Sequence, residues 1–247
     1  MRFLKIVFFL SVLLLPSIAF AWGPLTHVYL GSEILSLGYL LPAGIYSLLK
    51  KYRHDFLYGN LMADIIIGKK FLPDDKHPHS WDVALNLLDS ARTQQQKAFV
   101  YGYMSHLAAD TVAHGSFTNN TKNIGHTLNE IRADRIIDRK YWVQAVRIDR
   151  NVQQRNDIFL EKSLERALFS FKTNKRIFKG MLFLSVFNKE RPVSLAHRTA
   201  ISASIFPYFS REEIQQFHIE SIDRIVDILS NGRDSAVIND NPIAVVH

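Results

Sequence analysis

The sequence predicts an all-α protein, a single-domain bundle of roughly eight to ten helices. Three observations carry this prediction. Hydrophobic residues make up 47% of the 247-residue chain, which is enough for a substantial core. Apolar side chains recur at helical spacing in almost every segment, and alternating β patterns are nearly absent. No internal repeat or low-complexity linker divides the chain.

Each expected helix rests on a local pattern. Ser80 precedes a helix as its N-cap, with an acidic residue in the first turn. Gly115 is expected to end a long helix that begins at residue 94. The expected helical ranges are 27–37, 42–68 (one helix or two, with a break near Gly59), 80–92, 94–117 and 123–142, with three or four more between 157 and 230.

The first 21 residues have the three parts of a secretory signal peptide. Arg2 and Lys5 form a basic start, an apolar run follows, and a small-x-small motif ends at Ala21. The apolar run is too short for a comfortable membrane span, although an uncleaved anchor is the alternative. Cleavage after Ala21 would leave residues 22–247 as a secreted or periplasmic domain that begins with Trp22.

Cysteine content and net charge indicate the cellular compartment and the kind of binding partner. The chain has no cysteine and therefore no disulfide, which fits a bacterial envelope better than a eukaryotic secretory pathway. The formal net charge is +7, and removing the two positive charges of Arg2 and Lys5 leaves +5. This mild excess favours anionic partners such as phospholipid headgroups or nucleic acid.

Polar side chains gather on two of the expected helices. His106, Asp110 and His114 lie at i, i+4 and i+8, which aligns them along one helix face. His126 and Glu130 repeat the i, i+4 spacing on the next helix. A single such pair is often an ordinary surface pair, but five polar groups among apolar neighbours would be costly to bury unpaired. Imidazole and carboxylate are the ligands that zinc takes when cysteine is absent, so the bundle is predicted to enclose a zinc cluster.

Further candidates lie upstream of these helices. Asp64 falls near the end of an apolar helix, where a carboxylate could also be a simple cap or turn residue. His77 and His79 fall in a loop before the next helix, where ordinary loop histidines are also common.

Together these residues resemble the zinc-dependent phospholipase C family and the related fungal zinc nucleases. Members of that superfamily begin, after processing, with a tryptophan whose free amine and carbonyl oxygen bind zinc. The Trp-Gly-x-x-x-His spacing from Trp22 to His27 looks like the nuclease branch, whereas Glu130 at the last ligand position is similar to the phospholipase branch. The resemblance covers roughly half of the mature chain, and no motif is found in the C-terminal part beyond it.

The resemblance implies two to three zinc ions per chain. The implied ligand sets are His79, His106 and Asp110 for the first ion, the amine and carbonyl of Trp22 with His27 and Asp110 for the second, and His114, His126 and Glu130 for the third. Asp64 stands where the family has its catalytic carboxylate, taken as the general base, and its interval to His79 favours that histidine over His77. The intervals on either side of His114 are shorter than in the family, so the third site is expected to be distorted or weakly occupied.

The resemblance implies hydrolysis of a phosphodiester by a zinc-activated water, with a phospholipid headgroup as the first candidate substrate. One alternative is a single-strand nuclease, which needs aromatic platforms such as Tyr58, Tyr101 or Tyr103, although their helical spacing also fits the core. A second alternative is a non-catalytic zinc-binding envelope protein, which would have no use for Asp64 as a base. No stable protein partner is implied.

The stretch 171–192 joins basic residues to Phe and Leu. Such a segment could make peripheral contact with an anionic membrane. The alternative is an ordinary amphipathic helix whose apolar side faces the core, which we expect more often for this pattern.

Overall fold

The computed structural model describes residues 22–66, 72–113, 133–134, 136–164, 169–187 and 210–243, and every regular element in them is a helix. The α-helices of these ranges are α2 (Pro24–Ser36), α3 (Ala43–Lys51), α4 (Arg53–Met62), α5 (Trp81–Ser90), α6 (Gln94–Val112), α8 (Arg139–Val146), α9 (Arg150–Ser163), α10 (Phe171–Phe187) and α12 (Arg211–Asn231). This confirms the predicted all-α fold class.

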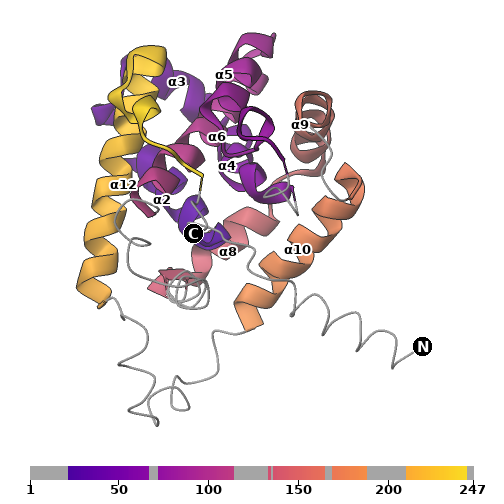
Figure 1. Cartoon of the computed structure of the whole chain (residues 1–247). Coiled ribbons are helices and arrows are strands. Elements are labelled where there is room, and N and C mark those ends of the chain that lie inside the picture. The colour runs from indigo at the N-terminus through magenta and orange to yellow at the C-terminus, as the bar shows by residue number, and fades with distance from the viewer. Residues whose placement is uncertain are drawn as a thin grey trace.

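Helices α4 and α6 form the centre of the bundle and pack at very short range (Figure 1). A Cβ atom on Gly59 would lie 2.0 Å from the carbonyl oxygen of Phe99, and one on Gly102 would lie 2.0 Å from that of Phe56. The two glycines therefore let the backbones of the two helices touch. The predicted helix break near Gly59 is wrong, because the chain breaks at Tyr52 and Gly59 lies inside α4 as a packing residue.

Helix α12 packs along α6 and α2, on the side of the bundle away from α9 and α10 (Figure 1). It begins with a capping box in which Ser210 and Glu213 satisfy each other's backbone N–H groups. It ends at Gly232, whose φ of 56° is a conformation that glycine adopts without strain. Ile214 and Ile225 on its inner face are buried, so this C-terminal helix completes the core.

Helix ends follow local signals in most places. Ser80 caps α5 as expected, and a capping box of Thr93 and Gln96 starts α6. The predicted stop at Gly115 lies outside the described residues. The predicted single helix over 123–142 is wrong at its C-terminal end, because the chain leaves the helical conformation before Asp138, which caps the separate helix α8.

Helix α10 starts the basic and aromatic stretch singled out in the sequence. Phe171 and Phe178 of this helix are buried in the core, as an amphipathic helix of a globular protein requires. Among the described residues, no helix has both the length and the apolar content needed to cross a bilayer. Contact of this segment with an anionic membrane surface stays a prediction.

Candidate metal centre

Helix α6 carries two of the predicted ligands on its buried face. His106 and Asp110 lie one turn apart, and both side chains are almost completely buried. The Nε2 atom of His106 lies 3.2 Å from Oδ2 of Asp110. The helical i, i+4 spacing seen in the sequence therefore places an imidazole and a carboxylate side by side in the interior.

The end of α4 and the loop before α5 bring two further side chains to the same place. Asp64 lies in the short 3₁₀ turn η2 (Ala63–Ile65) that extends α4. Nε2 of His79 lies 3.3 Å from Oδ1 of Asp64 and 3.1 Å from Oδ2 of Asp110. The same Nε2 atom is 3.0 Å from Nε2 of His106. Three separate elements thus converge on one buried point.

His77 takes another position in this loop. Its Nδ1 atom accepts a hydrogen bond of 3.1 Å from the backbone N–H of His79. Nearby, the hydroxyl of Tyr103 donates to the carbonyl oxygen of Pro78. These contacts hold the loop in the shape that turns His79, and not His77, toward Asp64 and Asp110.

Helix α2 contributes His27 from its first turn. The His27 ring stacks on the His106 ring with centroids 3.6 Å apart and an interplanar angle of 16°. Its Nε2 atom lies 3.3 Å from Oδ1 of Asp110. Asp110 is therefore shared, with one oxygen facing His27 and the other facing His79 and His106.

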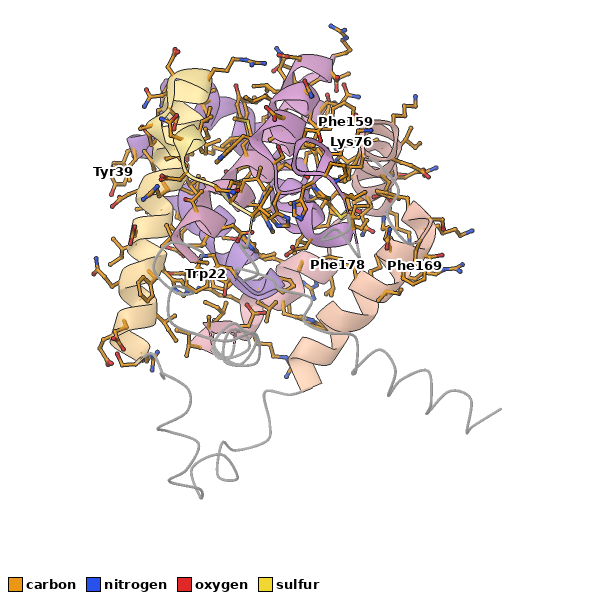
Figure 2. The ribbon with its side chains drawn as sticks, in the orientation of Figure 1. Trp22, Tyr39, Lys76, Phe159, Phe169 and Phe178 are labelled. Atoms are coloured by element: carbon orange, nitrogen blue, oxygen red, sulfur yellow. The ribbon has the colours of Figure 1, made fainter. Side chains whose placement is uncertain are left out.

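Trp22 lies against the same part of α6. Its side chain is completely buried, and the indole N–H donates a hydrogen bond of 3.0 Å to the carbonyl oxygen of Ala109. Figure 2 shows Trp22 inside the bundle, on the side that α12 covers. Because Ala109 directly precedes Asp110, this bond holds the start of the described chain next to the shared carboxylate.

Asp134 anchors the residues that follow Trp22. Its carboxylate accepts hydrogen bonds from the backbone N–H groups of Leu25 and Thr26 and from the Thr26 hydroxyl, at 3.3, 2.9 and 2.9 Å. A Cβ atom on Gly23 would lie 2.3 Å from the Asp134 carboxylate carbon, so glycine is required there. Burial raises the pKa of Asp134 to about 6.

Burial and the neighbouring charges of opposite sign act in opposite directions on the pKa values of the three central groups. Burial, together with nearby His106, lowers the pKa of His27. Burial also disfavours the charged form of His106, but the carboxylates of Asp110 and Asp64 outweigh it and raise the pKa of His106. The two histidines in turn outweigh burial at Asp110 and hold its pKa well below its usual value. Asp110 is therefore a carboxylate anion at neutral pH.

Several polar atoms of this cluster have no hydrogen bond within the described part of the chain. They are both ring nitrogens of His27 and both carboxylate oxygens of Asp110. Buried polar atoms normally find partners, so their lack of hydrogen bonds is unusual. Ligand atoms within 4.8 Å of one another form two groups, Asp64–His79–His106 and His27–His106–Asp110. Imidazole nitrogens and carboxylate oxygens in such groups suit a zinc ion, which would bind the atoms that have no hydrogen bond.

Residues 26–176 match the family described as zinc dependent phospholipase C. The chain belongs to this family. Comparison with curated proteins and comparison with solved structures each found no match. The matched range includes the candidate site residues His27, Asp64, His79, His106 and Asp110. Trp22 and α12 lie outside it.

For this zinc dependent phospholipase C family member, the predicted site is only partly within the described residues. Trp22, His27, Asp64, His79, His106 and Asp110 lie together in the buried region described above. His114, His126 and Glu130 lie outside the described residues. Sequence reasoning missed Asn60, whose carbonyl oxygen lies 2.8 Å from Nδ1 of His106, and it missed Asp134.

Proposed function

We propose that the processed protein hydrolyses phospholipids at the headgroup phosphodiester, in a zinc-dependent reaction of phospholipase C type. The observation that supports this most strongly is the shared carboxylate of Asp110. One of its oxygens faces His27 and the other faces His79 and His106, in a chain of the zinc-dependent phospholipase C family. A shared carboxylate is what a cluster of neighbouring metal ions needs.

In this proposal, zinc is held by His79, His106 and Asp110 and by His27, Asp110 and the amine and carbonyl of Trp22. His114, His126 and Glu130 would hold the third ion. Zinc held there would lower the pKa of water to about 7 and would offset negative charge on phosphate oxygens. The buried histidines and carboxylates keep the ligand atoms fixed and exclude bulk water from them.

Asp64 is the proposed general base. It takes a proton from the attacking water while the water oxygen forms a bond to phosphorus. The bond from phosphorus to the glycerol oxygen breaks, and that oxygen gains a proton. The products are diacylglycerol and a phosphorylated headgroup. The distance of 3.3 Å between Asp64 Oδ1 and His79 Nε2 supports this role, because it puts the base beside the proposed metal ligands.

The proposed zinc site also requires removal of the leader. The nitrogen of Trp22 is an amide before cleavage and has no lone pair for a metal, whereas after cleavage after Ala21 it is an amine. A secreted or periplasmic location follows from that processing. The burial of the Trp22 side chain beside Ala109 supports the idea, since it holds this residue close to Asp110.

Two of the aromatic residues that a nuclease could use for base stacking are buried. The hydroxyl of Tyr58 donates to Asp157 at 2.6 Å, and Tyr103 is completely buried with its hydroxyl on Pro78. Stacking platforms for single strands have to be exposed. This favours the lipid as substrate over nucleic acid.

Hydrolysis assays on the processed protein test this proposal. A phosphatidylcholine analogue and single-stranded DNA are each incubated with the protein, with a zinc chelator, and with zinc restored. We expect hydrolysis of the lipid only, lost with the chelator and regained with zinc, and absent from an Asp64→Asn variant purified in the same way. Cleavage of the DNA alone would identify a nuclease. Stable zinc without either reaction would identify the non-catalytic alternative.

A further inference from the structure

Helix α12 lies beyond the part of the chain that matches the family, yet it packs against both helices that supply the cluster. One of these is α6, with His106 and Asp110, and the other is α2, with His27. A helix in this position can influence the site without contributing a ligand of its own.

His218 is the residue of α12 that reaches toward this region. Its ring centroid lies 5.2 Å from that of Trp22 and 5.2 Å from that of Tyr29, tilted by 58° and 55°. The side chain is only 3% exposed, and its Nε2 atom has no hydrogen bond within the described residues. Burial lowers the pKa of His218 to about 4, so the ring is neutral at pH 7. His218 therefore packs as a flat, uncharged aromatic ring.

Trp22 receives a contact from each of two helices. Helix α6 accepts the indole N–H at Ala109, and α12 packs the His218 ring against the indole. Asp134 fixes the backbone shortly after it, at Leu25 and Thr26. With the side chain and the following turn both held, the main-chain atoms of Trp22 have little freedom to move relative to Asp110.

We propose that His218 is a positioning residue, whose ring holds Trp22 so that the Trp22 amine and carbonyl face the metal shared with His27 and Asp110. This rests on the zinc site of the proposed function. It assigns a role to the C-terminal helix, which sequence motifs did not. His218 acts through Trp22 and touches neither metal nor substrate.

Zinc affinity of the processed protein, measured without substrate, tests this role. The N-terminal residue is first verified as Trp22, and zinc is then titrated against a chromophoric chelator. His218→Ala should weaken one zinc by about 10–100-fold, as loss of support behind a metal ligand does, and leave the zinc held by His79 and His106 unchanged. His218→Phe keeps a flat ring between Trp22 and Tyr29 and should restore affinity.

The matched control is Ile225→Ala. Ile225 is completely buried on the same helix, two turns or about 10 Å further along. This variant should be destabilised by about 2–5 kcal/mol, as buried Ile-to-Ala changes are, but should bind zinc like the wild type. A loss of affinity in His218→Ala that Ile225→Ala does not share is therefore specific to the His218 ring and not an effect of destabilising α12.

Two results overturn the role of His218. One is a His218→Ala variant whose zinc affinities all equal those of the wild type, and the other is equal weakening in Ile225→Ala. If His218→Ala does not fold, His218→Leu replaces it, because leucine has a similar volume but no aromatic ring to pack against the indole. Wild-type affinity in that variant also overturns the proposal. Because no substrate is present, a zinc-binding wild type that hydrolyses no lipid contradicts the proposed function alone.

Discussion

The carbonyl oxygen of Asn60 lies 2.8 Å from Nδ1 of His106, so a backbone group of α4 determines how a ring on α6 faces the cluster. A carbonyl can only accept, and therefore Nδ1 carries the proton of the neutral ring. The lone pair is then on Nε2, which points toward His79 and Asp110. A hydrogen bond behind a metal-binding histidine usually has this function.

Close packing of α4 on α6 is needed for that bond, and Gly102→Ala should disturb it. The added methyl group would lie 2.0 Å from the Phe56 carbonyl oxygen and 3.0 Å from the Asn60 nitrogen, both of them backbone atoms that cannot rotate away. We expect about 1–3 kcal/mol of destabilisation in urea unfolding, with reduced zinc content.

Gly44→Ala is the control for this change. A Cβ atom on Gly44 has no neighbour within 4 Å, and Gly44 lies inside helix α3. Alanine there should leave stability unchanged or raise it by up to about 1 kcal/mol through helix propensity. Wild-type stability in Gly102→Ala would mean that the two central helices can separate at no cost.

A second prediction concerns the metal content. The protein purified after export should carry two to three zinc ions per chain, and the chelated protein should unfold at a lower temperature. Zinc binds only the folded site, so its removal takes away that stabilisation. Elemental analysis and thermal unfolding measure the two effects. Less than one zinc per chain after careful purification would contradict the prediction.

A third prediction separates the two carboxylates. Asp64→Asn should keep its zinc but hydrolyse the substrate about 10²–10⁴-fold more slowly, because an amide cannot take a proton from water. Asp110→Asn should lose zinc itself, since both Asp110 oxygens face histidines of the cluster. Zinc analysis and initial rates are measured on both variants. A loss of zinc in Asp64→Asn would make Asp64 a ligand, as its distance of 3.3 Å to His79 also permits.

The shared buried face of His106 and Asp110 and the all-α fold class are predictable from the sequence, because both follow from helical periodicity. His106 and Asp110 share a helix face at any i, i+4 spacing, and the apolar surroundings that predicted burial are those of α6. In the sequence, only the family resemblance favours His79 over His77. The loop geometry that turns His79 inward depends on a backbone bond to His77 and on Tyr103, and neither contact has a sequence signal.

Other features could not be predicted from local patterns. Asp134 binds Thr26, which lies 108 positions earlier in the chain, and a contact over that distance produces no periodic pattern in the sequence. Gly59 suggests a helix break because glycine weakens isolated helices, but tertiary packing against α6 outweighs that cost. The contribution of His218 was missed for a related reason, since a single histidine on an amphipathic helix does not reveal which aromatic ring it will meet.

A fourth prediction concerns pH. Burial depresses the pKa of His218 to about 4 in the folded state, against 6.5 when exposed. Between these values the unfolded chain binds the proton and the folded chain does not, so the free energy of unfolding falls as pH falls through this window. At pH 4.5 the protonation of this group should lower the free energy of unfolding by about 2–3 kcal/mol.

The variant His218→Phe isolates that contribution. Asp134, His27 and His106 titrate in both proteins, so their effects cancel in the difference between wild type and variant. Urea unfolding of both metal-free proteins at pH 7 and pH 4.5 gives the comparison. An equal loss of stability in both proteins would show that His218 is protonated in the fold or exposed in solution.

The last prediction returns to the first residue of the processed chain. A cytosolic form that keeps a methionine before Trp22 should bind one zinc more weakly and hydrolyse lipid much more slowly. Its Trp22 nitrogen is a peptide nitrogen, which cannot ligate zinc at neutral pH. His27 and Asp110 remain, so we expect a large loss and not complete inactivity. Zinc content and phosphodiester hydrolysis are compared between this form and the processed protein.

The fold of the Met-extended form should survive, because the anchors of this segment do not involve the amine. The Trp22 indole still donates to Ala109, and Asp134 still accepts from Thr26. Similar far-ultraviolet circular dichroism of the two metal-free forms checks this point. Removing the methionine with an aminopeptidase should then restore both zinc and rate in the same sample. Equal zinc and equal rates before that treatment would show that Trp22 is an ordinary buried aromatic residue whose amine has no part in the site.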